Sequence, residues 1–323
     1  MVKNKEQNIF RRLVRSEVFG LLIALVAMIL LFSLINPNYF TIRNLRTVLT
    51  GASLIGLICV GESLMLIGGV MDLSPGSTAA FSGVVAAMLL RSGVPFGVVL
   101  LITVFIGVLV GSFNAFFITT LKINAFIATL ASQSIVRGFC YILSGGESIL
   151  ITNPSFLKMG TMNVLGFIPF PIFFMILIFV VFYIIMGRTR FGRNIYTVGG
   201  NAVAARLAGI STTATTYALF INMSVLAAVG GVILAARMNT GQPQACVGLE
   251  FDGITAAILG GVAMSGGVGS LGGAFVGLLI LQGFNTGLTI ANVQSFWQYV
   301  ARGGLMLLAL SFDYLRSQRR RKA

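Results

Sequence analysis

Residues 96–119 read FGVVLLITVFIGVLVGSFNAFFIT, and no charged side chain interrupts this apolar run. A helix needs about 20 mostly apolar residues to cross the hydrocarbon core of a bilayer. The run therefore predicts a transmembrane helix. Gly107, Gly111 and Ala115 recur every four residues along it. Small residues at this spacing predict close packing against a second membrane helix.

The rest of the chain has the same apolar character. Of its 323 residues, 57% are hydrophobic and only 9% are charged, and the mean hydropathy is +0.97. A soluble domain has about 25% charged residues. The apolar runs are unbroken, whereas a transmembrane barrel shows segments of about ten residues with alternating hydrophobicity. The composition predicts an all-α, polytopic transmembrane helical bundle.

The composition also excludes several kinds of chemistry. The chain has no histidine, and Cys59, Cys140 and Cys246 lie far apart without a CxxC pair. We therefore expect no metal site, no catalytic residue and no cofactor bound by this chain. No GxxxxGK[ST] motif is present, which excludes ATP hydrolysis by a P-loop. The net charge of +14 gathers at the ends of apolar runs, so it indicates membrane topology and not nucleic-acid binding.

About ten apolar runs qualify as membrane spans. They are 19–35, 45–67, 75–90, 96–119, 123–143, 166–186, 213–236, 251–264, 271–290 and 295–314. The third and the eighth are short for a complete crossing. These two runs predict interrupted or partly re-entrant helices.

The basic residues orient the spans. Their strongest clusters lie in the N-terminus, in residues 188–206 and in the tail. Because cytoplasmic segments are enriched in lysine and arginine, both termini and a loop at 187–212 are expected in the cytoplasm. The chain then divides into a basic N-terminus (1–18), one transmembrane domain (19–314) and a basic tail (315–323). Arg43 and Arg46 disagree with this topology, because it places them outside.

Two glycine-rich connections resemble each other. One contains Gly68, Gly69 and Asp72, and the other contains Gly260 and Gly261. Each lies between two apolar runs. Transporters are often built from internal repeats with interrupted helices near the pathway. The match predicts an internal repeat whose helix breaks act as a gate, and chance similarity between two glycine-rich segments is the alternative.

Glu62 lies deep inside an apolar run. An ionisable residue in such a run faces the bundle interior or water and is a functional hypothesis by default. The alternative is a protonated Glu62 that bonds to serine or threonine and stabilises helix packing.

The other acidic residues have structural explanations. Asp72 precedes Ser74 and Pro75, a suitable N-cap and first-turn pair for a helix start. Asp252 opens the eighth run and has the same capping explanation. Glu250 falls in an outer loop, where a solvated charge is expected.

The polar stretch 187–211 is the longest one expected in the cytoplasm. Asn201 is a suitable N-cap for a short helix over 202–207, which Gly209 would end. Ringed by arginine, this helix suits a docking surface. An ordinary interfacial helix that holds arginine at the lipid headgroups is the alternative.

Several blocks in this order resemble the permease subunits of monosaccharide ABC importers of the ribose, arabinose, xylose, galactose and autoinducer-2 type. The blocks are GGVMDLSPGS (68–77), LKINAFIATLASQSIVRG (121–138), GRNIYTVGGNAVAARLAGI (192–210), AAILGGVAMSGGVGSLGGAFVGLLIL (256–281) and SFWQYVARGGLMLLALSFDYLR (295–316). The first has one extra residue and Pro75 in place of the usual valine. The second has Ala125 where proline is common. These departures concern substrate preference and local helix geometry.

The resemblance implies a multi-pass subunit of the bacterial inner membrane that works as a homodimer or heterodimer among membrane lipids. Its implied partners are a cytoplasmic ABC ATPase, which holds ATP and Mg²⁺, and a periplasmic sugar-binding protein. The resemblance also implies a coupling helix that docks on the ATPase. Its residues are Gly199, Gly200, Asn201, Ala204, Ala205 and Arg206.

A path for a neutral sugar needs only sparse groups that hydrogen-bond to hydroxyls. The candidates are Glu62, Asn114, Gln133 and Asn222. The last three are equally well explained as hydrogen bonds between helices. A proton-coupled sugar symporter with Glu62 as proton carrier is the alternative function. An ABC permease for nucleosides or branched-chain amino acids is the nearer one.

Overall fold

The computed structural model describes residues 17–322, so most of the basic N-terminus lies outside the described residues. The described chain is mainly helical. Its elements are α2 (Glu17–Ile35), η1 (Pro37–Phe40), α3 (Ile42–Ile67), α4 (Pro75–Arg91), α5 (Phe96–Thr119), α6 (Ala125–Ser144), β1 (Ile149–Leu150), α7 (Pro154–Thr161), β2 (Asn163–Val164), β3 (Ile168–Pro169), α8 (Phe170–Arg188), α9 (Arg190–Gly200), α10 (Ala202–Leu207), α11 (Thr212–Met238), β4 (Thr240–Gly241), α12 (Leu249–Leu259), α13 (Leu271–Ile290) and α14 (Ser295–Lys322).

Six helices of the described chain are long and apolar enough to cross a membrane, namely α3, α5, α6, α8, α11 and α13. The helical membrane bundle is therefore confirmed, and each of these helices matches one of the ten expected runs. The helix α12 has only 11 residues and α4 has 17, as expected for the two short runs. The crossing of α2, α4, α12 and α14 stays a prediction.

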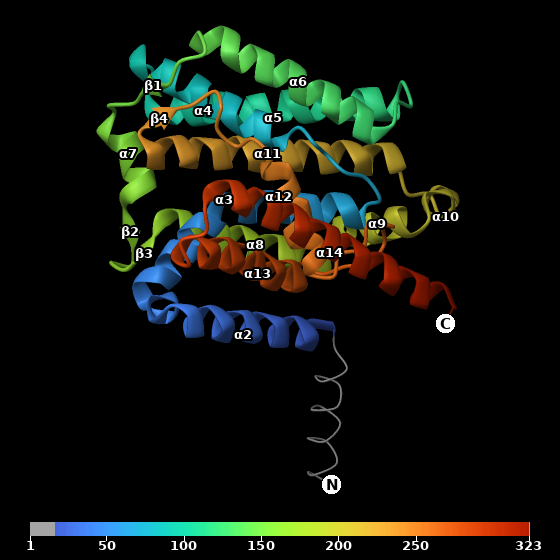
Figure 1. Cartoon of the computed structure of the whole chain (residues 1–323). Coiled ribbons are helices and arrows are strands. Elements are labelled where there is room, and N and C mark those ends of the chain that lie inside the picture. The colour runs from blue at the N-terminus through green and yellow to red at the C-terminus, as the bar shows by residue number, and fades with distance from the viewer. Residues whose placement is uncertain (1–16, 323) are drawn as a thin grey trace.

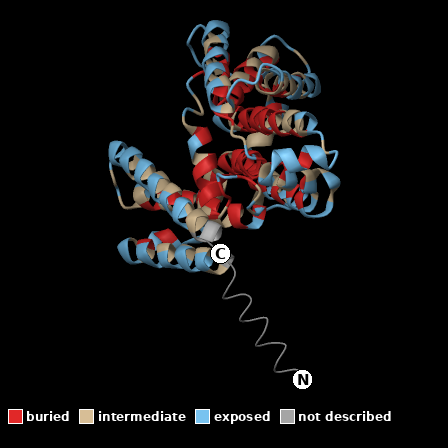
Figure 2. Cartoon of the chain, turned by 90° about the vertical axis from the view of Figure 1, so that its right-hand side faces the viewer, coloured by how far each residue is buried: buried red, intermediate tan, exposed pale blue. Residues whose placement is uncertain are grey.

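The helices lie side by side in layers (Figure 1). The long helix α11 contacts α4 and α5 on one side and α3 on the other, while α13 packs between α3 and α2. Among the six candidate spans, α3 and α11 are the most buried. Figure 2 shows the buried residues gathered in the middle of the bundle, with exposed residues on the outer helices.

The expected close packing of the helix over 96–119 is confirmed. The glycines of α5 face α11: a Cβ at Gly107 would lie 2.7 Å from the Cα of Val225, and a Cβ at Gly111 would lie 2.6 Å from the Cα of Ile221. A side chain has no room at either position. The two helix backbones therefore approach each other only because these residues are glycine.

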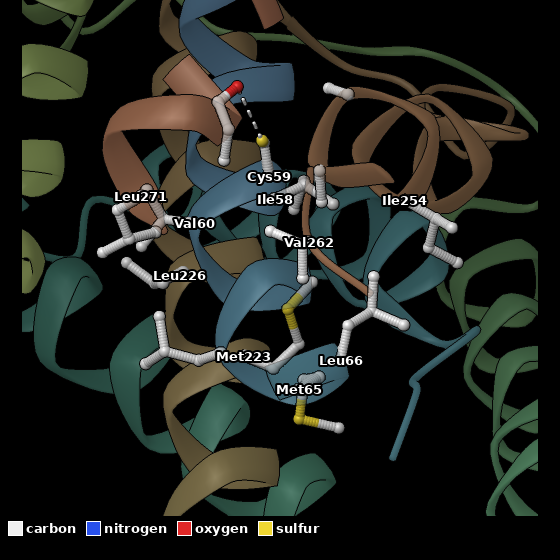
Figure 3. Close-up of a cluster of buried hydrophobic side chains, with 14 of the residues drawn as sticks. Ile58, Cys59, Val60, Met65, Leu66, Met223, Leu226, Ile254, Val262 and Leu271 are labelled. Carbon is white, nitrogen blue, oxygen red and sulfur yellow. Dashed lines mark hydrogen bonds between the residues drawn. The ribbon is translucent and has the colours of Figure 1, made fainter. Parts of the chain in front are cut away.

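The largest hydrophobic cluster surrounds α3 (Figure 3). Met223 and Leu226 from α11 and Ile254 from α12 contribute to it. The thiol of Cys59, fully buried on α3, donates to the carbonyl oxygen of Ala274 on α13 at 3.7 Å. This cluster fixes α3, α11, α12 and α13 against one another and so holds the helix ends described below.

The two ends of the bundle differ. The start of α2, the helix α10 and the end of α14 lie at one end (right in Figure 1), and α7 with the two-stranded pair β1–β4 and the hairpin β2–β3 lies at the other. The helix α14 continues through residue 322, and the division into a basic N-terminus, one transmembrane domain and a basic tail stays a prediction. At the hairpin end, Arg46 donates to the carbonyl oxygen of Phe167 at 2.7 Å. A structural bond thus accounts for a basic residue that the expected topology places outside.

Candidate functional site

The two glycine pairs end their helices with the same geometry. Gly68 caps α3 with φ −74° and ψ −3°, and Gly260 caps α12 with φ −71° and ψ 0°. Gly69 and Gly261 follow with φ +79° and +88°, a region that glycine enters without steric cost. In both cases the next N–H bonds to the carbonyl five residues back at 3.0 Å. The helices α4 and α10 end with the same geometry, at Gly93 and Gly209, so it is a common helix end in this chain, and the internal repeat stays a prediction.

These two helix ends meet the helix α9. The N–H of Gly267 donates to the carbonyl oxygen of Ile67 at 2.8 Å. A Cβ at Gly199 would overlap that same carbonyl and lie 2.9 Å from the nitrogen of Gly267. The hydroxyl of Tyr196 donates to the carbonyl oxygen of Gly269 at 2.9 Å, and burial raises the pKa of this hydroxyl. The α9 backbone therefore contacts the end of α3 and the connection after α12 at one point.

The short helix after Asn201 is confirmed. Its carboxamide oxygen accepts the N–H groups of Val203 at 3.0 Å and Ala204 at 2.9 Å, and α10 follows. Gly209 ends the turn with φ +80°. The stretch 187–212 also contains a second helix, α9, which begins at Arg190.

The six expected coupling residues have different surroundings. Ala205 is fully buried, and Gly199 is enclosed by backbone. The exposed members are Gly200, Asn201, Ala204 and Arg206. The exposed residues are available to a partner, whereas the enclosed ones hold the helix on the bundle. Their coupling role stays a prediction.

Asp72 belongs to a buried polar chain at the start of α4. Its Oδ1 accepts both the N–H of Ser74 at 2.8 Å and the hydroxyl of Ser74 at 2.7 Å. The Nδ2 of Asn114, on α5, donates to the same hydroxyl oxygen at 2.9 Å. As expected, α4 begins at Pro75, but the Ser74 side chain bonds to Asp72 and does not cap the helix.

Glu62 lies in the interior, as expected, but on no open surface of this structure. Its side chain is fully buried on α3, and neither of its oxygens has a hydrogen-bond partner among the described residues. The carboxyls of Asp72 and Glu250 are close enough to interact with it electrostatically. Burial of an unpaired polar group costs free energy. The unpaired oxygens of Glu62 therefore make this region polar and energetically unfavourable.

The expected solvated position of Glu250 is wrong. The residue lies in the first turn of α12 and is 1% exposed. Its Oε1 accepts a hydrogen bond from the Nε2 of Gln133 at 2.9 Å. A Cβ at Gly76, in the first turn of α4, would overlap its other oxygen. Glu250 therefore lies where two helices begin, and the partial positive charge of helix N-termini favours a carboxylate there.

The chain reaches this position because residues 242–248 turn back into the bundle. The guanidinium of Arg137 donates to the carbonyl oxygens of Pro243 at 2.6 Å and Ala245 at 2.8 Å. Arg137 and Gln133 lie near the middle of α6, which is a candidate span. The non-helical segment 242–248 therefore lies at mid-span depth, beside α6.

The capping explanation of Asp252 is also wrong, because Gly248 is the N-cap of α12. Asp252 lies 4.0 Å from Arg302 on α14, and the Nε of Arg302 donates to the Oδ1 of Asn285 on α13 at 3.2 Å. Sequence reasoning missed Arg137 and Arg302, although both interrupt apolar runs. The rule that singled out Glu62, that a charge inside a span marks function, applies equally to them.

Of the four expected pathway residues, three join the region where α4 and α12 begin. Asn114 reaches Asp72 through Ser74, Gln133 reaches Glu250, and Glu62 lies beside both carboxyls. Asn222 stands apart, because its amide donates to the Ala218 carbonyl of its own helix at 2.7 Å.

Comparison with known proteins identifies the family. Residues 44–310 match the family described as "Branched-chain amino acid transport system / permease component". The chain belongs to this permease family. The permease is 40% identical to the L-arabinose ABC transporter permease protein AraH of Azospirillum brasilense, over 93% of this chain and 89% of that protein. No solved structure matches the permease.

Other relatives of the permease are of the same kind. The L-arabinose transport system permease protein AraH of Escherichia coli (strain K12) is 35% identical, over 94% of this chain and 93% of its own length. The ribose import permease protein RbsC of Haemophilus influenzae is 33% identical, over 97% and 98%. The chain is therefore a multi-pass membrane transport subunit and not an enzyme.

Proposed function

We propose that this permease forms the translocation path of an ATP-driven importer for a monosaccharide. The observation that carries the proposal is the non-helical segment 242–248 at mid-span depth, beside the first turns of α4 and α12. Backbone of this kind is tolerated at membrane depth only where it is buried in protein or lines a water-filled cavity. Interrupted helices that begin near the middle of the membrane are typical of transporter binding regions.

The relatives support a monosaccharide as the substrate. Proteins named for L-arabinose and for ribose resemble this permease over more than nine tenths of its length, which includes the segment 242–248 and the helices α9 and α10. The family description, which names branched-chain amino acids, supplies the second candidate substrate. The polar side chains found between the helices fit the hydroxyl groups of a neutral sugar.

We infer that ATP acts on the path through α9 and α10. A partner ATPase, which holds ATP and Mg²⁺, would dock on the exposed residues Gly200, Ala204 and Arg206. Because Gly199 contacts Ile67 and lies beside Gly267, a push on α9 reaches the ends of two helices together. The two helix ends then move as one unit, which suits a switch between two discrete states.

The proposal also includes an orientation of the permease in the membrane and its remaining partners. The end of the bundle with α10 and the end of α14 is cytoplasmic, as the arginine content of α9 and α10 favours. A periplasmic binding protein delivers the sugar to the opposite end. A second permease copy, identical or related, completes the path within the bacterial inner membrane and its lipids.

Uptake into proteoliposomes tests the function. The permease is reconstituted with its ATPase and binding protein, and uptake of labelled L-arabinose, D-ribose and L-leucine is followed with ATP or with a proton gradient. We expect uptake of a sugar that requires ATP and both partners. Uptake of leucine alone would select the second candidate. Sugar uptake by the permease alone, driven by protons, would overturn the proposal in favour of a symporter.

A further inference from the structure

The segment 242–248 and the first turn of α12 have one side that is partly exposed in this structure. Val247 is 74% exposed and Phe251 is 44% exposed. The backbone between Gln242 and Gly248 is non-helical and lies beside the middle of α6. Since such backbone does not face lipid, this partly exposed side faces water or another protein surface.

A charged pair adjoins this partly exposed side. The side chains of Arg302 and Asp252 are 40% and 20% exposed, and their nearest N and O atoms are 4.0 Å apart. Asn285, which accepts the Nε of Arg302, is 5% exposed, and its own Nδ2 has no partner in the described structure. Since α13 is a candidate span, Asn285 holds Arg302 at membrane depth.

The pair does not close into a hydrogen-bonded ion pair. Charged side chains inside a membrane protein pair tightly or face a water-filled cavity. Here the carboxylate and the guanidinium do not reach hydrogen-bonding distance, and both remain accessible. A guanidinium has five N–H donors, and the bond to Asn285 uses one of them. Guanidinium donors of Arg302 and carboxylate oxygens of Asp252 are thus available to a ligand beside the first turn of α12.

We propose that Asp252 and Arg302 line the aqueous path and contact the hydroxyl groups of the passing sugar, with Phe251 beside them. The inference rests on the proposed function, whose path it locates along the partly exposed side of α12, next to α14. A sugar hydroxyl donates to the carboxylate and accepts from the guanidinium, so one hydroxyl bridges the gap between the two side chains. Contacts of this kind are few, which suits a path that must release what it binds.

Cysteine accessibility tests the inference in the reconstituted complex. Arg302→Cys and Phe251→Cys are treated with a charged, membrane-impermeant methanethiosulfonate, and the rate of the native chain with its three cysteines is subtracted. Phe251→Cys leaves the charged pair intact, so it carries the test if Arg302→Cys does not assemble. Val300→Cys is the control, because Val300 is 64% exposed and points about 160° away from Arg302 around the same helix.

We expect modification at positions 251 and 302 to be about tenfold faster than at 300, because a thiol in apolar surroundings forms little thiolate. Turnover with L-arabinose or D-ribose should slow the reaction at 251 and 302 several-fold, while sucrose should not. The inference is overturned if positions 251 and 302 react no faster than position 300. It is also overturned if neither sugar changes the rates at 251 and 302. ATP-driven sugar uptake by the native complex, measured beside these rates, distinguishes that failure from failure of the proposed function.

Discussion

Gly267 donates its backbone N–H to the carbonyl oxygen of Ile67 at 2.8 Å, so the connection after α12 is tied to the end of α3. Gly199 of α9 lies against the same carbonyl. One carbonyl group therefore joins three elements that are far apart in the sequence. The helix expected to meet the ATPase is in this way linked to both glycine pairs.

Gly199→Ala should loosen this junction. The added methyl group meets backbone atoms of Ile67 and Gly267, which no side-chain rotation relieves, so we expect a loss of about 1–3 kcal/mol. Thermal unfolding of the purified permease measures the loss, and ATPase stimulation in the complex should fall as well. Gly187→Ala is the matched control, because its Cβ would meet no atom within 4 Å. Equal stability of the two variants would contradict the prediction.

Ser74→Ala should destabilise the start of α4. The substitution removes the hydroxyl that bonds to Asp72 and to Asn114, and it leaves buried polar atoms unpaired, at a cost of about 1–3 kcal/mol. Ser82→Ala is the control on the same helix. Ser82 is also fully buried, but its hydroxyl has no hydrogen-bond partner in the described part of the chain, so its removal should be neutral or stabilising. Denaturation curves of both variants measure the change in the free energy of unfolding. A larger loss of stability for Ser82→Ala than for Ser74→Ala would refute the explanation.

Arg137→Gln should weaken the attachment of the segment 242–248 to α6. It removes charge-assisted bonds to Pro243 and Ala245, so Cys246 should become more reactive toward thiol reagents and sugar uptake should fall. Thiol labelling and uptake, measured on the same preparation, provide the check. Ser134→Ala is the control, because Ser134 is exposed and bonds only to the Leu130 carbonyl of its own helix. Unchanged labelling of Cys246 in Arg137→Gln would show that the arginine does not hold the segment.

Glu62→Gln separates the importer from the symporter. Glu62 is buried and has no hydrogen-bond partner within residues 17–322, and a neutral amide of the same shape avoids the cost of a buried charge. ATP-driven sugar uptake should therefore persist, and thermal stability should not fall. Uptake under ATP and under an imposed proton gradient is compared with that of the native chain. Loss of a proton-driven component on Glu62→Gln would support the symporter.

The sequence alone determined the class of the fold and several local structures. Unbroken apolar runs require helices, because a backbone in lipid must satisfy its own hydrogen bonds. The glycines of α5, the Pro75 start of α4 and the Asn201 cap of α10 act within a few residues or along one helix face. Their effects can therefore be predicted from spacing.

Only the tertiary structure decided which polar groups meet. Glu250 follows Pro243 and Gly248, a pattern typical of a surface loop, and nothing local shows that the chain turns back into the bundle. The bonds from Arg137 on α6 hold it there. The approach of Asp252 to Arg302, 50 positions later in the sequence, likewise depends on how α12 and α14 pack. Pairing between distant segments depends on packing and on bonds across the bundle, and the pattern of one segment does not contain that information.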